Sequence, residues 1–155
     1  MDAQIVLRTS LLELLDGKSA HIDLETVIKT FPVNEMNTHV PNSPHTAWEL
    51  LEHIRLALWD IIEFSRDAAH VSPDFAEGYW NRSTATIEDW RRSSEQILND
   101  LQAIRDLAAD VNRDLFAEIP HGSGQTFLRE VLLAADHNAY HLGQLMLLRR
   151  MLEAT

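Results

Sequence analysis

The sequence predicts an all-α protein, an up-down four-helix bundle with one short extra helix in the first connection. Apolar residues recur at steps of three and four over four long stretches, and no stretch alternates apolar and polar residues as a strand would. Capping residues, Pro and Gly lie at the ends of these stretches. The chain has 155 residues, 45% of them apolar, so 1–155 is expected to form a single domain around one core.

The first quarter of the chain predicts one long helix and one short one. The long helix covers about 2–16 and should stop at Gly17, because Gly accepts the left-handed conformation that ends helices. The short helix covers about 23–31, with Asp23 as its cap. Residues 32–43 are rich in Pro and Asn and are expected to form a loop.

The second long helix has the broadest apolar side. Ser43 followed by Pro44 predicts its start, because the hydroxyl can cap and Pro fits the first helical turn. It should run to about Ala69 and carries His53 near its middle.

The connection over 70–83 contains three aromatic residues, Phe75, Tyr79 and Trp80. They can pin the connection to the bundle or wall a pocket. The first interpretation is preferred from the sequence.

Two further helices complete the predicted bundle. The third begins among Ser83, Thr84 and Thr86 and ends near Val111, and the last runs from between 123 and 126 to about Leu152. Both carry unbroken three-four stripes, typical of bundle seams. The third stripe comprises Ile87, Trp90, Ser94, Ile97, Leu101, Ile104, Ala108 and Val111, and the last includes Asn138 and His141.

Composition limits the classes of partner. The net charge of −11 disfavours binding to nucleic acid and to anionic membranes. The chain has no Cys, so thiolate ligands and a Cys nucleophile are excluded. No segment resembles a signal peptide or reaches the length of a membrane span, and the expected location is the cytoplasm.

A histidine pair near the C-terminus suggests a metal site. His137 and His141 lie four residues apart, so a helix stacks both imidazoles on one face. His53 is the expected third ligand. Gly143 is expected to let a neighbouring backbone approach closely. The alternative is that these are core histidines hydrogen-bonded to protein groups.

Helix geometry indicates helpers for such a site. Glu49, one turn before His53, is the candidate catalytic residue, as a base or as an acceptor for an imidazole N–H. Glu130, two turns before His137, could serve in the same way but is rather expected to be solvated. Asp60 is expected to be a buried partner of a Trp or an Arg. Gln144 can orient a water or serve as a packing group. The other five histidines are expected in loops or on the surface: His21, His39, His45, His70 and His121.

Two motifs resemble those of a known family. Trp48-Glu49-Leu50-Leu51-Glu52-His53 is similar to the second-helix signature of the DinB-like superfamily, and the run from His137 to Leu145 is similar to its last-helix signature of two histidines, Gly and Gln. The family includes YfiT-type metal-dependent hydrolases and bacterial thiol S-transferases. Leu142 departs from it, because many members carry Arg there.

The resemblance implies a bundle that holds nickel or zinc through His53, His137 and His141, and a homodimer. It implies an enzyme, a hydrolase or low-molecular-weight-thiol S-transferase, that acts on a small electrophile by activating water or a thiol at the metal. The alternative is a non-catalytic helical binding or dimerisation module with a structural or vestigial metal site. Ligands that are all His leave coordination positions open, which favours the enzyme.

Overall fold

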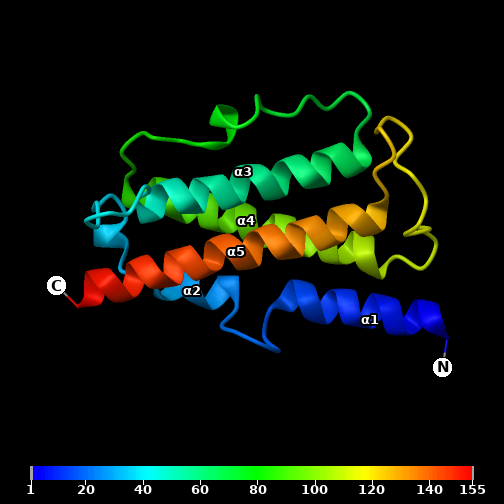
Figure 1. Cartoon of the computed structure of the whole chain (residues 1–155), viewed down its shortest axis with the longest axis horizontal. Helices are drawn as coiled ribbons and strands as arrows, with labels where there is room; N and C mark the ends of the chain where they lie inside the picture. Colours follow the sequence, from blue (N-terminus) through cyan, green and yellow to red (C-terminus); the bar gives the residue numbers. More distant parts are fainter. Residues whose placement is uncertain (1, 155) are drawn as a thin grey trace.

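Four long helices lie side by side in the computed structural model, which describes residues 2–154 (Figure 1). They are α1 (Ala3–Asp16), α3 (Ala47–Arg66), α4 (Ile87–Ala109) and α5 (Phe127–Glu153). A short helix, α2 (Leu24–Thr30), lies in the first connection, and two single turns of 3-10 helix are η1 (Val33–Glu35) and η2 (Glu77–Tyr79). The described residues form no strand, only an isolated bridge between Glu118 and Thr126. The predicted all-α bundle, with a short extra helix in the first connection, is confirmed.

One connection breaks the predicted up-down order of the helices. α3 and α4 run the same way, because the connection over residues 67–86 returns along the length of the bundle before α4 begins (Figure 1). In agreement, Ser93 near the start of α4 donates a hydrogen bond of 2.5 Å to Glu52 near the start of α3. The turn η2 of this returning connection packs against α3.

The helix ends follow capping chemistry. Gly17 ends α1 with a φ of 67°, as predicted. The predicted start of α3 at Ser43 and Pro44 is wrong: Thr46 is the cap, and its side chain and that of Glu49 satisfy each other's backbone N–H groups. This reciprocal pair outweighs the single hydroxyl of Ser43, which instead donates to the carbonyl of His45 at 2.6 Å. α3 also ends earlier than predicted, at Arg66.

The core lies around α3, which packs against both α4 and α5, while α1 packs against α4 and α5 from the other side. The seam of α4 is buried in its middle, but Ile87 and Val111 at the two ends of the predicted stripe are 57% and 79% exposed. Asn138 and His141 on α5 are buried, as their seam positions predict. No described helix has both the length and the apolarity that a membrane crossing requires.

Candidate metal centre

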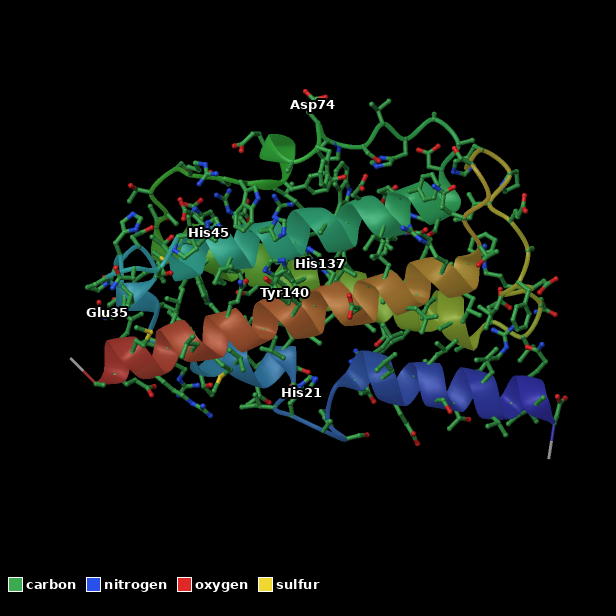
Figure 2. The ribbon with its side chains drawn as sticks, viewed as in Figure 1. His21, Glu35, His45, Asp74, His137 and Tyr140 are labelled. Carbon is green, nitrogen blue, oxygen red and sulfur yellow. The ribbon has the colours of Figure 1, made fainter. Side chains whose placement is uncertain are left out.

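Three histidines meet at mid-length of the bundle between α3 and α5. His53 comes from α3, and His137 and His141 come from adjacent turns of α5. The ring centroid of His53 lies 4.9 Å from that of His137 and 4.4 Å from that of His141, and the latter two are 4.5 Å apart. One ring nitrogen from each lies within 4.8 Å of the other two. Figure 2 shows His137 in this position between the two helices.

Two protein acceptors orient the rings. The Nδ1 of His53 lies 3.0 Å from the backbone oxygen of Tyr79, and the Nδ1 of His141 lies 2.7 Å from Oε1 of Gln144. Both acceptors are oxygens without hydrogen, so each Nδ1 carries the proton and donates. The lone pair of each ring is therefore on Nε2, and that of His53 lies 3.1 Å from Nε2 of His137. Such bonds fix the tautomer and the orientation of metal-ligating histidines.

The third ring, that of His137, contacts the cluster through its Nε2. The Nε2 of His137 lies 3.1 Å from the Nε2 of His53, whereas its buried Nδ1 has no hydrogen-bond partner. The nitrogen of His137 that faces the cluster is therefore Nε2, and an ion bound there would leave the surroundings of Nδ1 unchanged.

All three imidazoles are neutral near pH 7. Burial, reinforced by the neighbouring rings of His141 and His53, lowers the pKa of His137 to about 3. Burial likewise lowers the pKa of His53 and of His141. Neutral imidazole is the form that binds a metal, so the cluster keeps its lone pairs available.

The three imidazole nitrogens are a donor set that fits a divalent metal ion. Imidazole nitrogens bind such ions at about 2.0–2.1 Å, so two of them on one ion lie roughly 2.9–3.4 Å apart. The observed 3.1 Å between the Nε2 atoms of His53 and His137 falls in this range. Three such ligands leave room for a further ligand. The structure therefore brings together the three histidines predicted from the sequence in an arrangement that could hold a metal ion.

Trp80 closes one side of the cluster. Its indole stacks on His53 with centroids 3.9 Å apart and planes 2° apart, and on His45 at 3.9 Å and 11°. Two rings this close cannot share one face of an indole, so Trp80 lies between the two imidazoles. The sequence showed that this connection is rich in aromatic residues, but not that Trp80 contacts His53. The carbonyl of Tyr79 was also missed, since any residue can supply a backbone acceptor.

A second polar cluster fastens the connection over the site. Asp60 on α3 accepts hydrogen bonds of 2.7 Å from Nε2 of His70 and from the hydroxyl of Tyr79. Burial and the Asp60 carboxylate raise the pKa of Tyr79 to about 12. The expectation that Asp60 pairs with a Trp or an Arg is wrong, and so is that of a surface His70, whose side chain is 7% exposed. Asp60 thus holds two points of the connection.

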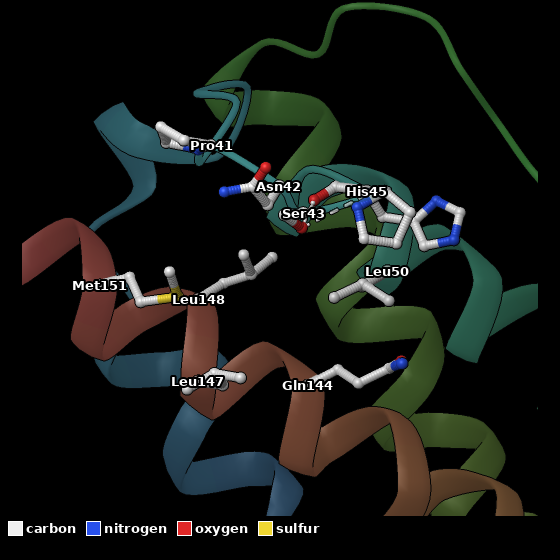
Figure 3. Close-up of a pocket in the computed structure, with 10 residues that line it drawn as sticks. Pro41, Asn42, Ser43, His45, Leu50, Gln144, Leu147, Leu148 and Met151 are labelled. Carbon is white, nitrogen blue, oxygen red and sulfur yellow. Dashed lines mark hydrogen bonds between the residues drawn. The ribbon is translucent and has the colours of Figure 1, made fainter.

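Two cavities flank the histidines. The loop cavity, of about 220 Å³, lies between α3, α5 and the connection; His53 and His137 line it, and so do all three aromatics of the connection. This placement supports the pocket-wall interpretation of those aromatics, which the sequence did not favour. The α5 cavity, of about 320 Å³, lies between residues 41–45 and α5 (Figure 3). Gln144 lines it, and the Oε1 of the same side chain lies 2.7 Å from Nδ1 of His141.

Several predicted helpers lie elsewhere. Glu49 accepts from the backbone N–H of Thr46 at 2.9 Å and lies 3.7 Å from Nδ1 of His45, so the acceptor for His53 is the Tyr79 carbonyl instead. Glu130 is buried at 2% exposure and paired with Arg129, so its prediction as a solvated group is wrong.

The remaining predictions on single residues give a mixed result. An added Cβ at Gly143 would meet no atom within 4 Å, so this Gly serves no close approach. His21 and His39 are exposed, as predicted. Figure 2 places His21 at the turn between α1 and α2, away from His137.

A helical bundle with a three-histidine cluster of this kind defines a class of candidate metal-binding proteins. A family model described as the DinB superfamily matches residues 19–145, which include all three histidines, and the chain belongs to that superfamily. Comparisons with curated proteins and with solved structures found no match.

Proposed function

We propose that this protein is a metal-dependent enzyme, a hydrolase or a low-molecular-weight-thiol S-transferase that acts on a small electrophile. One observation carries the proposal: His53 and His137 line a cavity while their Nε2 atoms lie 3.1 Å apart in a cluster with His141. A structural metal site has no need of a cavity beside its ligands. Here two of the three ligand side chains form part of the cavity wall.

The residues have separable roles in this proposal. His53, His137 and His141 hold the ion, with nickel or zinc as the best candidates. When bound, such an ion acidifies a water or a thiol and polarises a carbonyl. The Tyr79 carbonyl and Gln144 keep two rings in the ligating tautomer. A catalytic role for Glu49 requires it to act from the His45 side of Trp80, because its carboxylate lies there.

A dimerisation module is the second candidate, and the exposed surface of α5 favours it. Apolar side chains on this helix are well exposed: Leu132, Tyr140, Leu147 and Met151 at 43%, 63%, 59% and 40%. Burying them against a second copy would contribute to a homodimer. A homodimer is also compatible with catalysis, so access to the metal decides between the two candidates.

The test measures metal content and metal access together. The purified protein should hold about one equivalent of nickel or zinc, and azide or a small thiol should perturb the spectrum of the nickel or cobalt form. His53→Ala, His137→Ala and His141→Ala should each lose the metal, whereas His39→Ala, at an exposed histidine, should keep it. Full occupancy in all three cluster variants would refute the metal site. Full occupancy in the unchanged protein without access for azide or thiol would favour the module.

A further inference from the structure

Tyr79 contacts α3 at two points, one through its backbone and one through its side chain. Its backbone oxygen lies 3.0 Å from Nδ1 of His53, and its hydroxyl donates a hydrogen bond of 2.7 Å to Asp60. His53 and Asp60 are seven residues apart on α3, so they lie on the same face, about 10 Å apart along the helix axis. A single residue of the connection, which runs along α3 in Figure 1, therefore spans two turns of the helix that carries His53.

The helix offers His53 no acceptor of its own. Glu49, one turn earlier, accepts instead from the backbone N–H of Thr46. Without an acceptor at Nδ1, the proton of a neutral imidazole can sit on either nitrogen, and a ring protonated on Nε2 cannot bind a metal through that atom. The Tyr79 carbonyl therefore selects the tautomer of His53 whose lone pair is on Nε2.

The carbonyl stays on His53 only while the connection lies against α3. The turn η2, which ends at Tyr79, contains no buried residue, so apolar packing contributes little to holding it. Asn81 donates to Glu52 at 3.3 Å, a longer hydrogen bond than that from the Tyr79 hydroxyl to Asp60. Burial and the Asp60 carboxylate raise the pKa of Tyr79 to about 12, so the hydroxyl remains a donor near neutral pH. The bond to Asp60 is thus the strongest polar anchor at this point of the connection.

We propose that Tyr79 is a positioning residue for the metal site: its hydroxyl bond to Asp60 holds its carbonyl on Nδ1 of His53 and so keeps Nε2 of His53 available to a metal. The inference rests on the metal site of the proposed function and adds a residue to its support. It couples metal binding to closure of the connection, because a protein that is closed for a fraction of the time binds the metal with an affinity reduced by that fraction.

The first test compares the two tyrosines of the chain. Tyr79→Phe removes the hydroxyl but keeps the ring and the carbonyl, and should lower the zinc affinity, measured by competition with a chromophoric chelator, roughly three- to tenfold. Tyr140→Phe is the matched control, because Tyr140 is 63% exposed and its ring packs edge-on against another cluster residue, His141, with centroids 4.8 Å apart. It should keep the affinity of the unchanged protein. Unchanged affinity in Tyr79→Phe would overturn the inference.

A second control separates positioning from stability. His70→Leu removes the other hydrogen bond to Asp60, and His70 contacts Trp59 and Asp60 rather than the histidine cluster. This variant should lose stability in urea and keep its zinc affinity. Equal losses of zinc affinity in His70→Leu and Tyr79→Phe would overturn the inference, because the effect would then follow the loss of stability and not the Tyr79 carbonyl.

The ring nitrogens of His53 in the metal-free protein report the positioning directly. Protonated and unprotonated imidazole nitrogens have well-separated nitrogen NMR shifts, and the signals of His53 are assigned by their loss in His53→Gln. In the unchanged protein Nδ1 should be protonated and Nε2 unprotonated. In Tyr79→Phe the two shifts should move towards each other as the tautomers mix. Identical shifts of His53 in the two proteins would overturn the inference.

Zinc uptake, measured on the same samples, separates this inference from the proposed function. If the unchanged protein takes up no zinc, the metal site is refuted, and the nitrogen signals of His53 decide the positioning role of Tyr79 by themselves. If the unchanged protein binds zinc while Tyr79→Phe keeps both its affinity and its nitrogen signals, the metal site stands and the positioning role is refuted.

Discussion

The His137→Leu variant tests whether the cluster is maintained for a metal at the expense of stability. In the metal-free protein the buried Nδ1 of His137 has no partner, which costs about 1–3 kcal/mol. The Nε2 of His137 lies 3.1 Å from the Nε2 of His53, and this hydrogen bond stabilises the folded protein by about 1 kcal/mol. Leu has a similar volume and no polar atom, so it should raise the free energy of unfolding by about 1 kcal/mol.

Zinc should reverse this order. An ion at about one hundred times its dissociation constant stabilises the unchanged protein by about 2.7 kcal/mol, and the variant has lost one ligand. The assay is urea denaturation followed by far-UV circular dichroism, with chelator and with zinc. The unchanged protein should be the less stable of the two in chelator and the more stable in zinc.

A second histidine provides the control. His70 is also buried, but its Nε2 donates to Asp60 at 2.7 Å. His70→Leu should therefore destabilise the protein in chelator and in zinc alike. The reasoning is refuted if His137→Leu unfolds as easily as His70→Leu in chelator, or if zinc stabilises His137→Leu as much as the unchanged protein.

Three further predictions follow from the contacts. The folded pKa of each cluster histidine lies below that of the unfolded chain, so the unfolded state binds more protons below about pH 6.5. Metal-free stability should consequently fall as the pH drops from 7 to 5, and unfolding that is flat over this range would contradict the shifts. Gln144→Ala removes the acceptor of His141 and should weaken zinc binding roughly 10- to 100-fold in a competition titration, with little change in melting. Glu52 accepts from Arg55 at 2.7 Å and from Ser93 at 2.5 Å, so Glu52→Ala should cost roughly 3 kcal/mol in urea denaturation; a loss below 1 kcal/mol would show that water replaces it.

The full set of hydrogen-bond partners of the Glu52 carboxylate could not be predicted from the sequence. Burial acts to raise its pKa, but the hydrogen bonds from Arg55, Ser93 and Asn81 outweigh burial and lower it. Its three partners come from α3, α4 and the connection between them. The spacing along the chain shows only Arg55, three residues after Glu52 on the same helix, whereas Ser93 and Asn81 reach Glu52 because α3 and α4 run in parallel.

Periodicity and spacing alone determined the all-α class, the positions of the long helices and the metal-ligand candidates. These properties are local: a helix repeats every 3.6 residues, so the chain itself shows that His137 and His141 share a face. The exact helix starts were harder to predict, because several hydroxyl side chains near each start could act as the cap. At α3 the cap is Thr46 and not Ser43, because Glu49 adds a second hydrogen bond to the Thr46 cap.

Only the tertiary structure decided what surrounds the histidines. The path of residues 67–86 back along the bundle places Trp80 on His53, the Tyr79 carbonyl on its Nδ1, and Phe75 at the rim of the loop cavity. The same path places the Trp80 indole between His53 and His45, and Glu49 lies on the His45 side of that indole. A connection without a repeating pattern carries no local signal of its path, which is set by where Asp60 and the apolar face of α3 bind it.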